Sequence, residues 1–497
     1  MRETRYSNPK IGWIWYILVG ILVTATAALT AISVWYVATF NLEFKDLLFT
    51  LASPLQGTGT STVNDILNAV MPWAVGTLVA YIVIAGILSG PNWKFKMIRR
   101  VCAILSAVAF VASAVGCIYA FRIPGYLKLM SQQTTIYEDH YVDPDSVAIT
   151  SSGKTKNLIH IYMESMETTY ASAKISEMTP ETNFMPNLTE LAKNNVSFGD
   201  KKTGLAGFRS PMGTGWTIAA LLAQTSGIPF SFPVGENGNN TMSKRENFAT
   251  GLTTLGDILQ DKGYRNYFQC GSDATFGGRR NYFTQHGDYE ISDLYTARKD
   301  GDIASDYYVW WGYEDLHLYD IAKKNLLEIT QNSDQPFNYT MLTVDTHHVN
   351  GYLCSACPRD YGTRLANVVA CADNQVQEFI DWCYQQDFME DTVIVISGDH
   401  RRMDKTLVEG KTENERTIYN CFIGAEAEAT RTTSRICTTF DMFPTTLAAL
   451  GFEIEGDRLG LGVNLFSDLD TLAEEIGYET LDTEIQKFSD YYIREFL

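Results

Sequence analysis

Charged side chains are absent from three long stretches of this 497-residue chain, residues 11–42, 66–88 and 101–121. Each stretch reaches the roughly 20 apolar residues that a helix needs to cross the hydrocarbon core of a membrane. The first stretch is too long for a signal peptide and lacks a clear small-residue cleavage site. The sequence therefore predicts a three-span transmembrane anchor over residues 1–121. The alternative is a cleaved leader followed by a helical hairpin.

Positive charge is scarce in the remainder of the chain. The whole sequence has 39 Lys and Arg residues against 58 Asp and Glu residues, which gives a net charge of −19. Residues 1–121 hold eight basic and four acidic residues, so residues 122–497 carry a net charge of −23. Nucleic-acid phosphates require neutralisation by Lys and Arg. We therefore expect no nucleic-acid partner, and we interpret the acidic charge as keeping the domain soluble.

The basic residues of the anchor gather before the first stretch and between the second and third stretches. They are Arg2, Arg5, Lys10, Lys94, Lys96, Arg99 and Arg100. The loop between the first two stretches holds three acidic residues and a single lysine. The positive-inside bias places the basic segments in the cytoplasm. With three spans, everything after Phe121 is expected outside, as the extracytoplasmic domain of a multi-pass plasma-membrane protein.

A second Cys-x-x-Cys pair is missing, so Cys354-Ser-Ala-Cys357 has no partner motif with which to complete a zinc site. Seven of the nine cysteines follow the anchor, and disulfides can persist outside the membrane. We favour a structural loop disulfide, with Cys357–Cys371 as the preferred pair, over a zinc or redox motif. The odd count leaves at least one thiol unpaired in the monomer.

Internal repeats and long low-complexity tracts are also absent from residues 122–497. Residues 122–156 are interpreted as a juxtamembrane connector because they contain Pro124, Gly125 and a polar run. From 157 to 497, apolar β-rich runs alternate with helical patterns, which predicts an α/β domain with a mainly parallel central sheet. The predicted strands are Asn157–Met163, Tyr264–Cys270, Tyr339–Val344, Thr392–Ser397 and Tyr419–Ile423, and the predicted helices include Thr217–Ser226 and Val368–Gln386.

Histidines and carboxylates directly follow three of these strands, as Glu164, His347 and the pair Asp399-His400. In an open α/β sheet, ligands bind beyond the carboxyl ends of the strands. A carboxylate–histidine cluster at that edge suits a divalent transition metal, which would satisfy groups that are costly to bury unpaired. Each residue also has a plainer structural interpretation, Glu164 as a first-turn helix residue and Asp399-His400 as a hydrogen-bonded turn.

Thr217 follows the glycine-rich segment Gly213-Thr-Gly-Trp and directly precedes an apolar run. This position lies at or just inside a helix N-terminus, where free amides and the helix dipole favour an anion. Thr217 is therefore either an ordinary N-cap or a nucleophile that a metal activates, with Thr214 as the second choice.

Two further pairs offer contacts to a substrate. His347-His348 are interpreted as ligands of a second metal, as stabilisers of a leaving group or as partners of a substrate hydroxyl. Arg279-Arg280 offers cationic donors to phosphate oxygens, although an ordinary surface arginine pair is the plainer alternative.

Four segments of the sequence, in matching order over residues ~157–450, resemble the lipoteichoic acid synthase/phosphoglycerol transferase I family. The segments are Ile161-Tyr-Met-Glu-Ser165, Gly213-Thr-Gly-Trp-Thr-Ile-Ala219, Leu342-Thr-Val-Asp-Thr-His-His348 and Ser397-Gly-Asp-His400. This family has an alkaline-phosphatase/sulfatase-like fold and a similar membrane-anchor layout. Its synthases have five spans where this chain has three predicted spans, which weakens the case for polymer synthesis specifically. The sulfatase nucleophile motif Cys-x-Pro-x-Arg is absent near Thr217, which argues against sulfate-ester hydrolysis.

The resemblance implies a ligand set for one divalent metal: Glu164, Thr217, Asp399 and His400. The metal is Mn²⁺ in the synthases, with Mg²⁺ or Zn²⁺ as alternatives here. Thr217 would be the nucleophile, and Arg279 and His347 would act in catalysis by contacting the phosphate and glycerol of the substrate. His348 completes the predicted substrate-binding set.

We therefore expect a membrane-anchored, metal-dependent phosphoglycerol transferase. It would move a glycerophosphate group from phosphatidylglycerol, or a lipid-linked glycerophosphate, to an acceptor hydroxyl of a glycan or polymer through a phosphothreonine intermediate. The alternatives are a phosphoethanolamine transferase, an extracytoplasmic phosphodiesterase and a catalytically silent binding protein. Acceptor contacts are expected in the loops Gly235–Asn247 and Asn350–Thr363.

Overall fold

The computed structural model divides the chain into two compact units, Met1–Phe44 with Gly59–Lys128, and Lys45–Thr58 with Leu129–Leu497. The residues that it describes are 9–40, 44, 61–89, 93–151, 153, 156–176, 178–200, 205–231, 248–412 and 415–497. The predicted acceptor loop Gly235–Asn247 lies outside the described residues.

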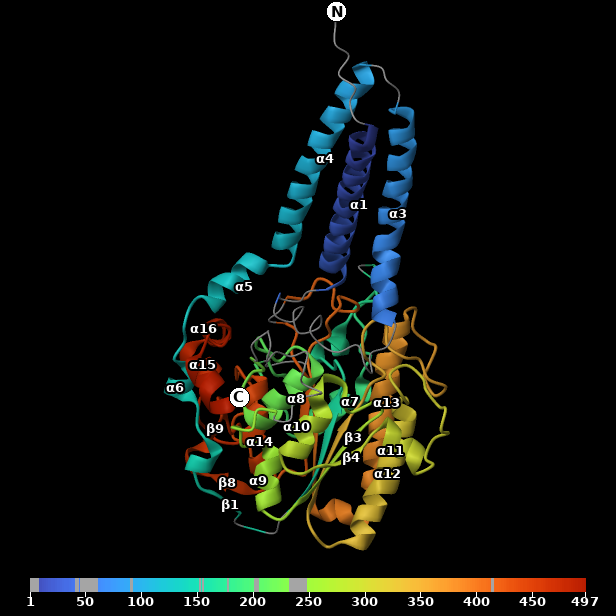
Figure 1. Cartoon of the computed structure of the whole chain (residues 1–497). Helices are drawn as coiled ribbons and strands as arrows, with labels where there is room; N and C mark the ends of the chain where they lie inside the picture. Colours follow the sequence, from blue (N-terminus) through green and yellow to red (C-terminus); the bar gives the residue numbers. More distant parts are fainter. Residues whose placement is uncertain are drawn as a thin grey trace, which may run out of the picture. The chain divides into compact units, whose positions relative to one another are not determined.

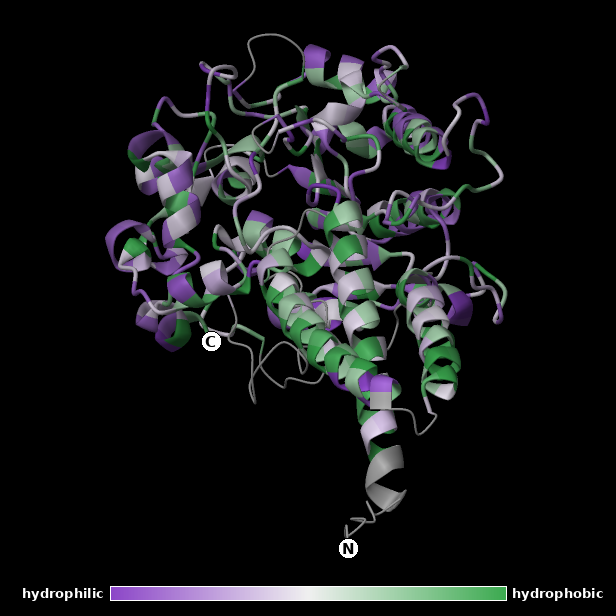
Figure 2. Ribbon diagram, turned by 90° about the horizontal axis from the view of Figure 1, so that it is seen from above, coloured by the Kyte–Doolittle hydropathy of each residue, from purple (hydrophilic) through white to green (hydrophobic). Residues whose placement is uncertain are grey.

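The first unit consists mainly of three long helices, α1 (Pro9–Thr39), α3 (Ser61–Ile87) and α4 (Trp93–Ala120). They are long and apolar enough to cross a membrane, and Figure 2 shows their hydrophobic surfaces in green. Helix α1 packs against both α3 and α4. At Gly20 a Cβ would lie 2.8 Å from the Tyr81 ring, so glycine permits this close approach. The three predicted spans are confirmed as three apolar helices.

The second unit contains a six-stranded sheet in the order β4-β3-β5-β2-β6-β7 (Figure 1). The strands are β2 (Asn157–Met163), β3 (Arg265–Cys270), β4 (Glu290–Ser292), β5 (Phe337–Leu342), β6 (Thr392–Gly398) and β7 (Asn420–Ile423). All neighbouring pairs are parallel except β6 and β7, which are antiparallel. The predicted mainly parallel α/β fold is confirmed.

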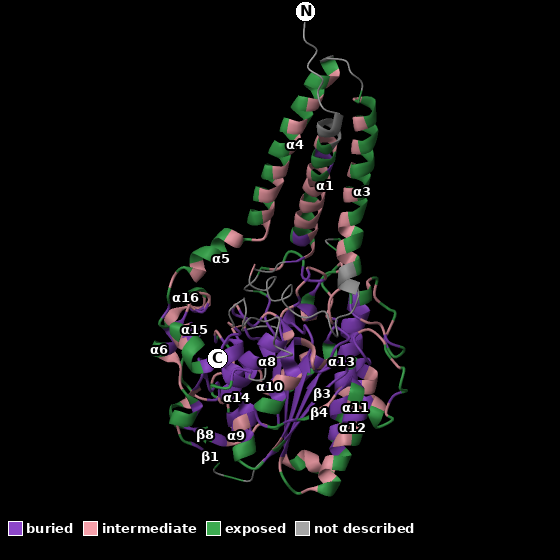
Figure 3. Cartoon of the chain, viewed as in Figure 1, coloured by how far each residue is buried: buried purple, intermediate pink, exposed green. Residues whose placement is uncertain are grey.

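Alternate side chains of the sheet pack against helices on opposite faces. Ile159 and Ile161 of β2 face a core shared with α7 (Pro186–Asn194), α12 (Asp315–Asn332) and α13 (Arg364–Cys383). On the other face, Leu158 and Tyr162 belong to cores built with a second group of helices. These are α8 (Thr217–Ser226), α9 (Leu255–Asp261), α10 (Arg279–Gln285) and α14 (Met442–Ala449). Figure 3 shows the resulting burial of the sheet between its two helical layers.

The chain also contains shorter elements. They are α5 (Ile123–Met130), α6 (Ile136–His140), β1 (Ile149–Ser151), α11 (Leu294–Lys299), β8 (Phe452–Ile454), β9 (Arg458–Leu459), β10 (Gly462–Val463), α15 (Leu472–Ile476) and α16 (Tyr478–Glu484). The segment predicted as a connector thus holds two short helices and a strand. Strand β1 pairs antiparallel with β8, which ties residues 149–151 to the second unit.

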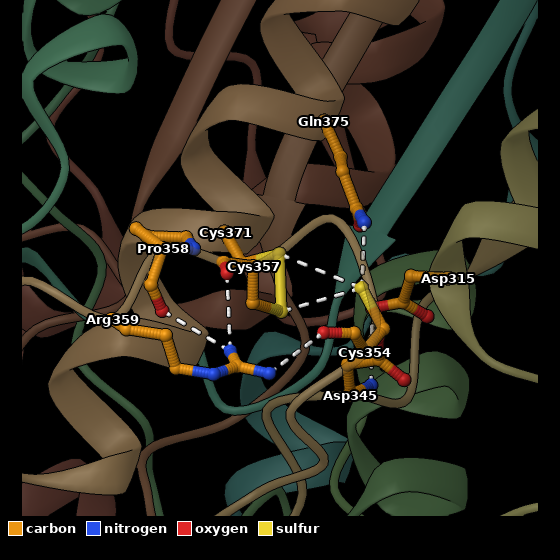
Figure 4. Close-up of a disulfide and its surroundings, with 8 residues drawn as sticks. All are labelled: Asp315, Asp345, Cys354, Cys357, Pro358, Arg359, Cys371 and Gln375. Carbon is orange, nitrogen blue, oxygen red and sulfur yellow. Dashed lines mark hydrogen bonds between the residues drawn. A yellow bond between two sulfur atoms is a disulfide. The ribbon is translucent and has the colours of Figure 1, made fainter.

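The loop between β5 and α13 is closed by a disulfide between Cys357 and Cys371, the pairing that we preferred from the sequence. A third sulfur lies beside this bridge, as Figure 4 shows. The Sγ atom of Cys354 is 3.3 Å from that of Cys357 and 3.8 Å from that of Cys371. The bridge holds the end of the loop to the first turns of α13, while His347 stands at the beginning of the same loop.

Candidate active site

Two adjacent parallel strands bring three polar side chains together at the carboxyl edge of the sheet. Met163 of β2 is in register with Gly398 of β6, so Glu164 and Asp399 leave their strands side by side. The Nε2 atom of His400 lies 3.4 Å from Glu164 Oε1 and 3.4 Å from Asp399 Oδ2. All three side chains are buried.

Hydrogen bonds fix one oxygen of each carboxylate and one ring nitrogen of His400. The amides of Ser165 and His400 donate to Asp399 Oδ1 at 2.7 and 2.6 Å. The hydroxyl of Ser165 donates to Glu164 Oε1 at 2.8 Å. His400 Nδ1 donates to the carbonyl oxygen of Arg401 at 2.7 Å, since a carbonyl can only accept. In a neutral ring this bond leaves the lone pair on Nε2, facing the two carboxylates.

The electrostatics of this cluster are unfavourable without a cation. Burial raises the pKa of Asp399 well above its ordinary range, and the charge on Glu164 raises it further. Burial also raises the pKa of Glu164, but His400, His347 and the bond from Ser165 outweigh it and bring the pKa to about 2. Two carboxylates therefore share one buried space, and a bound positive charge would stabilise both in the ionised form.

The unsatisfied atoms of the cluster fit a divalent metal ion. Asp399 Oδ2 and His400 Nε2 are buried and make no hydrogen bond among the described residues. One ligand atom from each of Glu164, Asp399 and His400 lies within 4.8 Å of the others. Two carboxylate oxygens and one imidazole nitrogen form a donor set that transition metals accept. Burying such groups without a partner is costly, and a bound metal ion would supply that partner.

Thr217 is the fourth member of the cluster. It is the first residue of α8, with Trp216 as the N-cap residue. Its Oγ1 donates to Glu164 Oε2 at 3.3 Å. The hydroxyl therefore stands both at the positive end of a helix dipole and at the edge of the metal-binding cluster.

The second candidate nucleophile, Thr214, is engaged elsewhere. Its buried hydroxyl donates to the carbonyl oxygen of Pro211 at 2.6 Å and lies 2.8 Å from Ser210 Oγ. These bonds tie Thr214 into its own turn, so of the two threonines Thr217 is the one whose hydroxyl is hydrogen-bonded to the cluster.

His347 follows β5 at the same edge of the sheet. Its Nδ1 donates to the carbonyl oxygen of His348 at 2.8 Å, so the neutral ring carries its lone pair on Nε2. The ring stacks on that of His348 with the centroids 4.3 Å apart and lies 4.7 Å from the ring of Trp311. Burial lowers the pKa of His347, an effect that the charge on Glu164 partly offsets. His347 is therefore suited to accept a hydrogen bond.

Arg279 begins α10 and is buried beneath its own turn. Its Nε donates to the carbonyl oxygen of Phe276 at 3.0 Å. Its Nη2 donates to Ser272 Oγ at 3.0 Å and to the carbonyl oxygen of Asp273 at 2.9 Å. These bonds fix the guanidinium group, but they do not connect it directly with the metal-binding cluster.

The turn before Arg279 nevertheless lies beside the start of α8. A Cβ at Gly277 would lie 3.5 Å from Ile218, the residue after Thr217. The ring of Phe276 lies 5.5 Å from that of Trp311, which in turn contacts His347. The rings of Phe276 and Trp311 thus connect the turn before Arg279 with His347.

Several supporting residues were not predicted from the sequence. The amide of Glu164 donates to Thr343 Oγ1 at 3.0 Å, and Thr346 Oγ1 donates to the carbonyl oxygen of Glu164. Gln224, in the third turn of α8, is fully buried and bonded to the end of β6. In the sequence, each of these residues appears only as a polar side chain inside an apolar helix or beside a strand end. That pattern does not identify its hydrogen-bond partner.

Comparison with known proteins identifies the class. Residues 156–452 match the family model described as Sulfatase, so this chain belongs to the sulfatase family. The fold agrees with a crystal structure of a protein in the alkaline phosphatase superfamily from Vibrio parahaemolyticus. That match has a TM-score of 0.50 and 21% sequence identity, and it covers 67% of this chain and 76% of the other.

Curated relatives of this chain are named phosphoglycerol transferase I. Phosphoglycerol transferase I of Xanthomonas axonopodis pv. citri is 30% identical over 303 residues, which are 60% of this chain and 41% of that protein. Phosphoglycerol transferase I of Salmonella choleraesuis is 29% identical over 466 residues, which are 89% of this chain and 56% of that protein. The chain thus spans about half the length of the curated relatives that it matches.

Proposed function

We propose that this chain is a membrane-anchored phosphoglycerol transferase. The observation that carries the proposal is the placement of Thr217 Oγ1 at the N-terminus of α8, 3.3 Å from Glu164 Oε2 in the buried cluster. The relatives named phosphoglycerol transferase I support the identity of the transferred group. The donor is phosphatidylglycerol or a lipid-linked glycerophosphate, and the acceptor is a hydroxyl of a glycan or polymer.

Glu164, Thr217, Asp399 and His400 would hold one divalent metal, for which we propose Mn²⁺, with Mg²⁺ and Zn²⁺ as alternatives. When bound, the metal lowers the pKa of the Thr217 hydroxyl and offsets negative charge on the phosphate. Ser165 and the amide of His400 keep Asp399 oriented, as their bonds to Oδ1 leave Oδ2 available.

The reaction proceeds in two displacements at phosphorus. In the first, a bond forms between Thr217 Oγ1 and phosphorus while the bond from phosphorus to the diacylglycerol oxygen breaks. The hydroxyl proton of Thr217 passes, overall, to the departing diacylglycerol. In the second, a bond forms between the acceptor oxygen and phosphorus while the bond from phosphorus to Thr217 Oγ1 breaks, and the proton of the acceptor hydroxyl passes, overall, to Thr217 Oγ1. The amides at the start of α8 and Arg279 favour the negative charge on the phosphate oxygens.

His347 orients hydroxyl groups in both displacements. Its neutral ring presents Nε2 as an acceptor, because Nδ1 is occupied by the carbonyl oxygen of His348. A glycerol or acceptor hydroxyl can therefore donate to Nε2 and be held for attack. His348 supports this role by stacking against the ring of His347.

Mass spectrometry of the intact full-length protein in detergent, with Mn²⁺ and phosphatidylglycerol, tests the proposal. We expect an adduct of phosphoglycerol mass that peptide mapping locates at Thr217 and that is absent from Thr217→Ala. The matched control is Thr214→Ser, which retains the neighbouring hydroxyl and should form the adduct. An adduct that forms only from phosphatidylethanolamine would mean that this lipid, and not phosphatidylglycerol, is the donor. Release of free glycerophosphate without any adduct would instead indicate direct hydrolysis.

A further inference from the structure

Helix α8 ends in three buried polar side chains, of which Gln224 is the one that carries an amide. The residues from Ile218 to Ala223 are apolar, and Gln224 follows them in full burial. Burying an amide costs free energy unless its hydrogen bonds are made inside the protein. The partners of Gln224 therefore indicate why the amide is there.

Those partners all lie at the end of β6. Gln224 Nε2 donates to the carbonyl oxygens of Gly398 and Asp399, each at 3.0 Å, and Oε1 accepts from Ser397 Oγ at 2.9 Å. The two N–H groups of the amide thus donate to two carbonyl oxygens, and the amide oxygen accepts from one hydroxyl. Only a carboxamide offers this combination, because a carboxylate would place an oxygen against both carbonyls.

The network continues into the centre of the sheet. His160 of β2 is fully buried, and its Nε2 lies 3.3 Å from Ser397 Oγ. Burial lowers the pKa of His160 to about 3, so the ring is neutral at physiological pH. Because the Ser397 hydroxyl donates its proton to Gln224, Nε2 is the donor to Ser397. The bonds thus run in one direction, from β2 through β6 to α8.

The position of Gln224 on the helix connects this network with the candidate nucleophile. Gln224 lies seven positions after Thr217, about two turns of helix, so both side chains lie on the same face of α8. Thr217 meets Glu164 at one end of that face, and Gln224 meets the main chain of Asp399 further along it. The bonds of Gln224 therefore join the face of α8 that carries Thr217 to the turn after β6.

We propose that Gln224 is a positioning residue that holds α8, and with it Thr217, against the metal-binding turn after β6. The roles of Thr217 and Asp399 rest on the proposed function. Gln224 does not touch the reacting atoms; it acts through the main chain of Asp399. Without it, two carbonyl oxygens at the cluster would lose their donors, and the turn would no longer be aligned with α8.

The test compares Gln224→Leu with Thr225→Val in the full-length protein. Thr225 is also buried in α8, where its hydroxyl bonds to Leu221 and to the Tyr282 hydroxyl, away from β6. Loss of an outer hydrogen bond to a metal ligand typically weakens metal binding or activity by about 10- to 100-fold. We therefore expect Gln224→Leu to raise the Mn²⁺ dissociation constant by such a factor. The rate of adduct formation at Thr217 should fall similarly with an unchanged KM for the donor lipid. Thr225→Val should change neither quantity.

Mn²⁺ affinity measured by calorimetry does not depend on which lipid reacts. A wild-type protein that binds Mn²⁺ but forms no adduct would therefore contradict the proposed function and leave the role of Gln224 measurable. Ser397→Ala, which removes only the bond to Oε1, provides a milder variant with an expected loss of Mn²⁺ affinity smaller than that of Gln224→Leu. If both variants bind Mn²⁺ as tightly as the wild type, and only their melting temperatures fall, Gln224 is merely a packing residue and the proposal is wrong.

Discussion

Asp399 divides its two carboxylate oxygens between the main chain and the cluster. Oδ1 accepts from the amides of Ser165 and His400, while Oδ2 is left for a cation. In Asp399→Asn the amide oxygen can keep the main-chain bonds while the NH₂ group replaces the second oxygen. We expect Mn²⁺ affinity to fall by at least about 100-fold while the fold persists, as calorimetry and circular dichroism would show.

The matched control for this prediction is Glu453→Gln, which removes an exposed carboxylate on β8. Its Mn²⁺ affinity should equal that of the wild type. Equal affinity in Asp399→Asn would mean that the ion does not bind at this cluster.

Asp373 of α13 makes stability depend on pH without taking part in the cluster. Its carboxylate accepts from the amides of Asn187 and Leu188 at the start of α7. Burial raises its pKa from 3.8 to about 6, although these two bonds oppose the shift. The carboxyl group is neutral in both folded and unfolded chains only well below pH 3.8. As the pH rises, the carboxyl group ionises in the unfolded chain before it ionises in the folded chain. The free energy of unfolding therefore falls until the pH passes about 6.

We expect the unfolding free energy of the wild type, relative to that of Asp373→Asn, to decrease by about 2 kcal/mol between pH 4 and pH 7. Urea unfolding of both proteins in the presence of a chelator would measure this difference, because the chelator removes any contribution from a bound metal. A difference that stays constant over this range would show that Asp373 titrates alike in the folded and unfolded chains.

At the scale of elements, the loop between β5 and α13 combines a candidate substrate contact with three neighbouring sulfurs. Cys354 Sγ lies 3.3 Å from Cys357 Sγ, so it can replace Cys371 as a partner. In Cys371→Ser we expect a Cys354–Cys357 disulfide, detected by peptide mapping after alkylation without reduction. Cys383→Ser, which changes a buried thiol at the end of the same helix, should retain the Cys357–Cys371 bridge. Two free thiols in Cys371→Ser under oxidising conditions would contradict the prediction.

The strand ends could be predicted from the sequence because their cause is local. Buried parallel strands appear as short apolar runs, and the polar residues that follow them must meet at one edge. Helix α8 was also predicted with its observed bounds. Helix α13, by contrast, begins at Arg364 rather than Val368, because Thr363 caps its N-terminus by accepting from the amide of Ala366 at 3.4 Å.

Other features depend on contacts between distant segments and could not be predicted. The bonds of Gln224 join residues that are 173 to 175 positions apart. The guanidinium group of Arg279 forms hydrogen bonds within its own turn, and its contact with phosphate stays a prediction. A sequence pattern shows which side chains are polar, but it does not show which long-range partner each will find.

At the scale of the whole molecule, charge governs the encounter with an anionic lipid. Residues 122–497 carry a net charge of −23, and phosphatidylglycerol membranes are negative. The domain is therefore repelled from its proposed donor at low ionic strength. For the full-length protein in vesicles rich in phosphatidylglycerol, we expect faster adduct formation as salt rises from about 0.01 to 0.15 M, over which the Debye length falls from about 30 to 8 Å.

Vesicles with a small fraction of phosphatidylglycerol in neutral lipid provide the control, since their surface potential is low. Their rate should change little with salt. A rate that falls with salt in the anionic vesicles would indicate attraction instead of repulsion.

The order of the cluster along the chain has a consequence for biosynthesis. Glu164 and Thr217 are 53 residues apart, whereas Ser165 and Asp399 are separated by 234. At synthesis rates of about 5–20 residues per second, roughly 10 to 50 seconds pass between the first ligand and the last. A nascent chain therefore cannot assemble the full ligand set until β6 has emerged. The ion proposed for this cluster would consequently bind late, from the metals supplied in the compartment where the domain completes its folding.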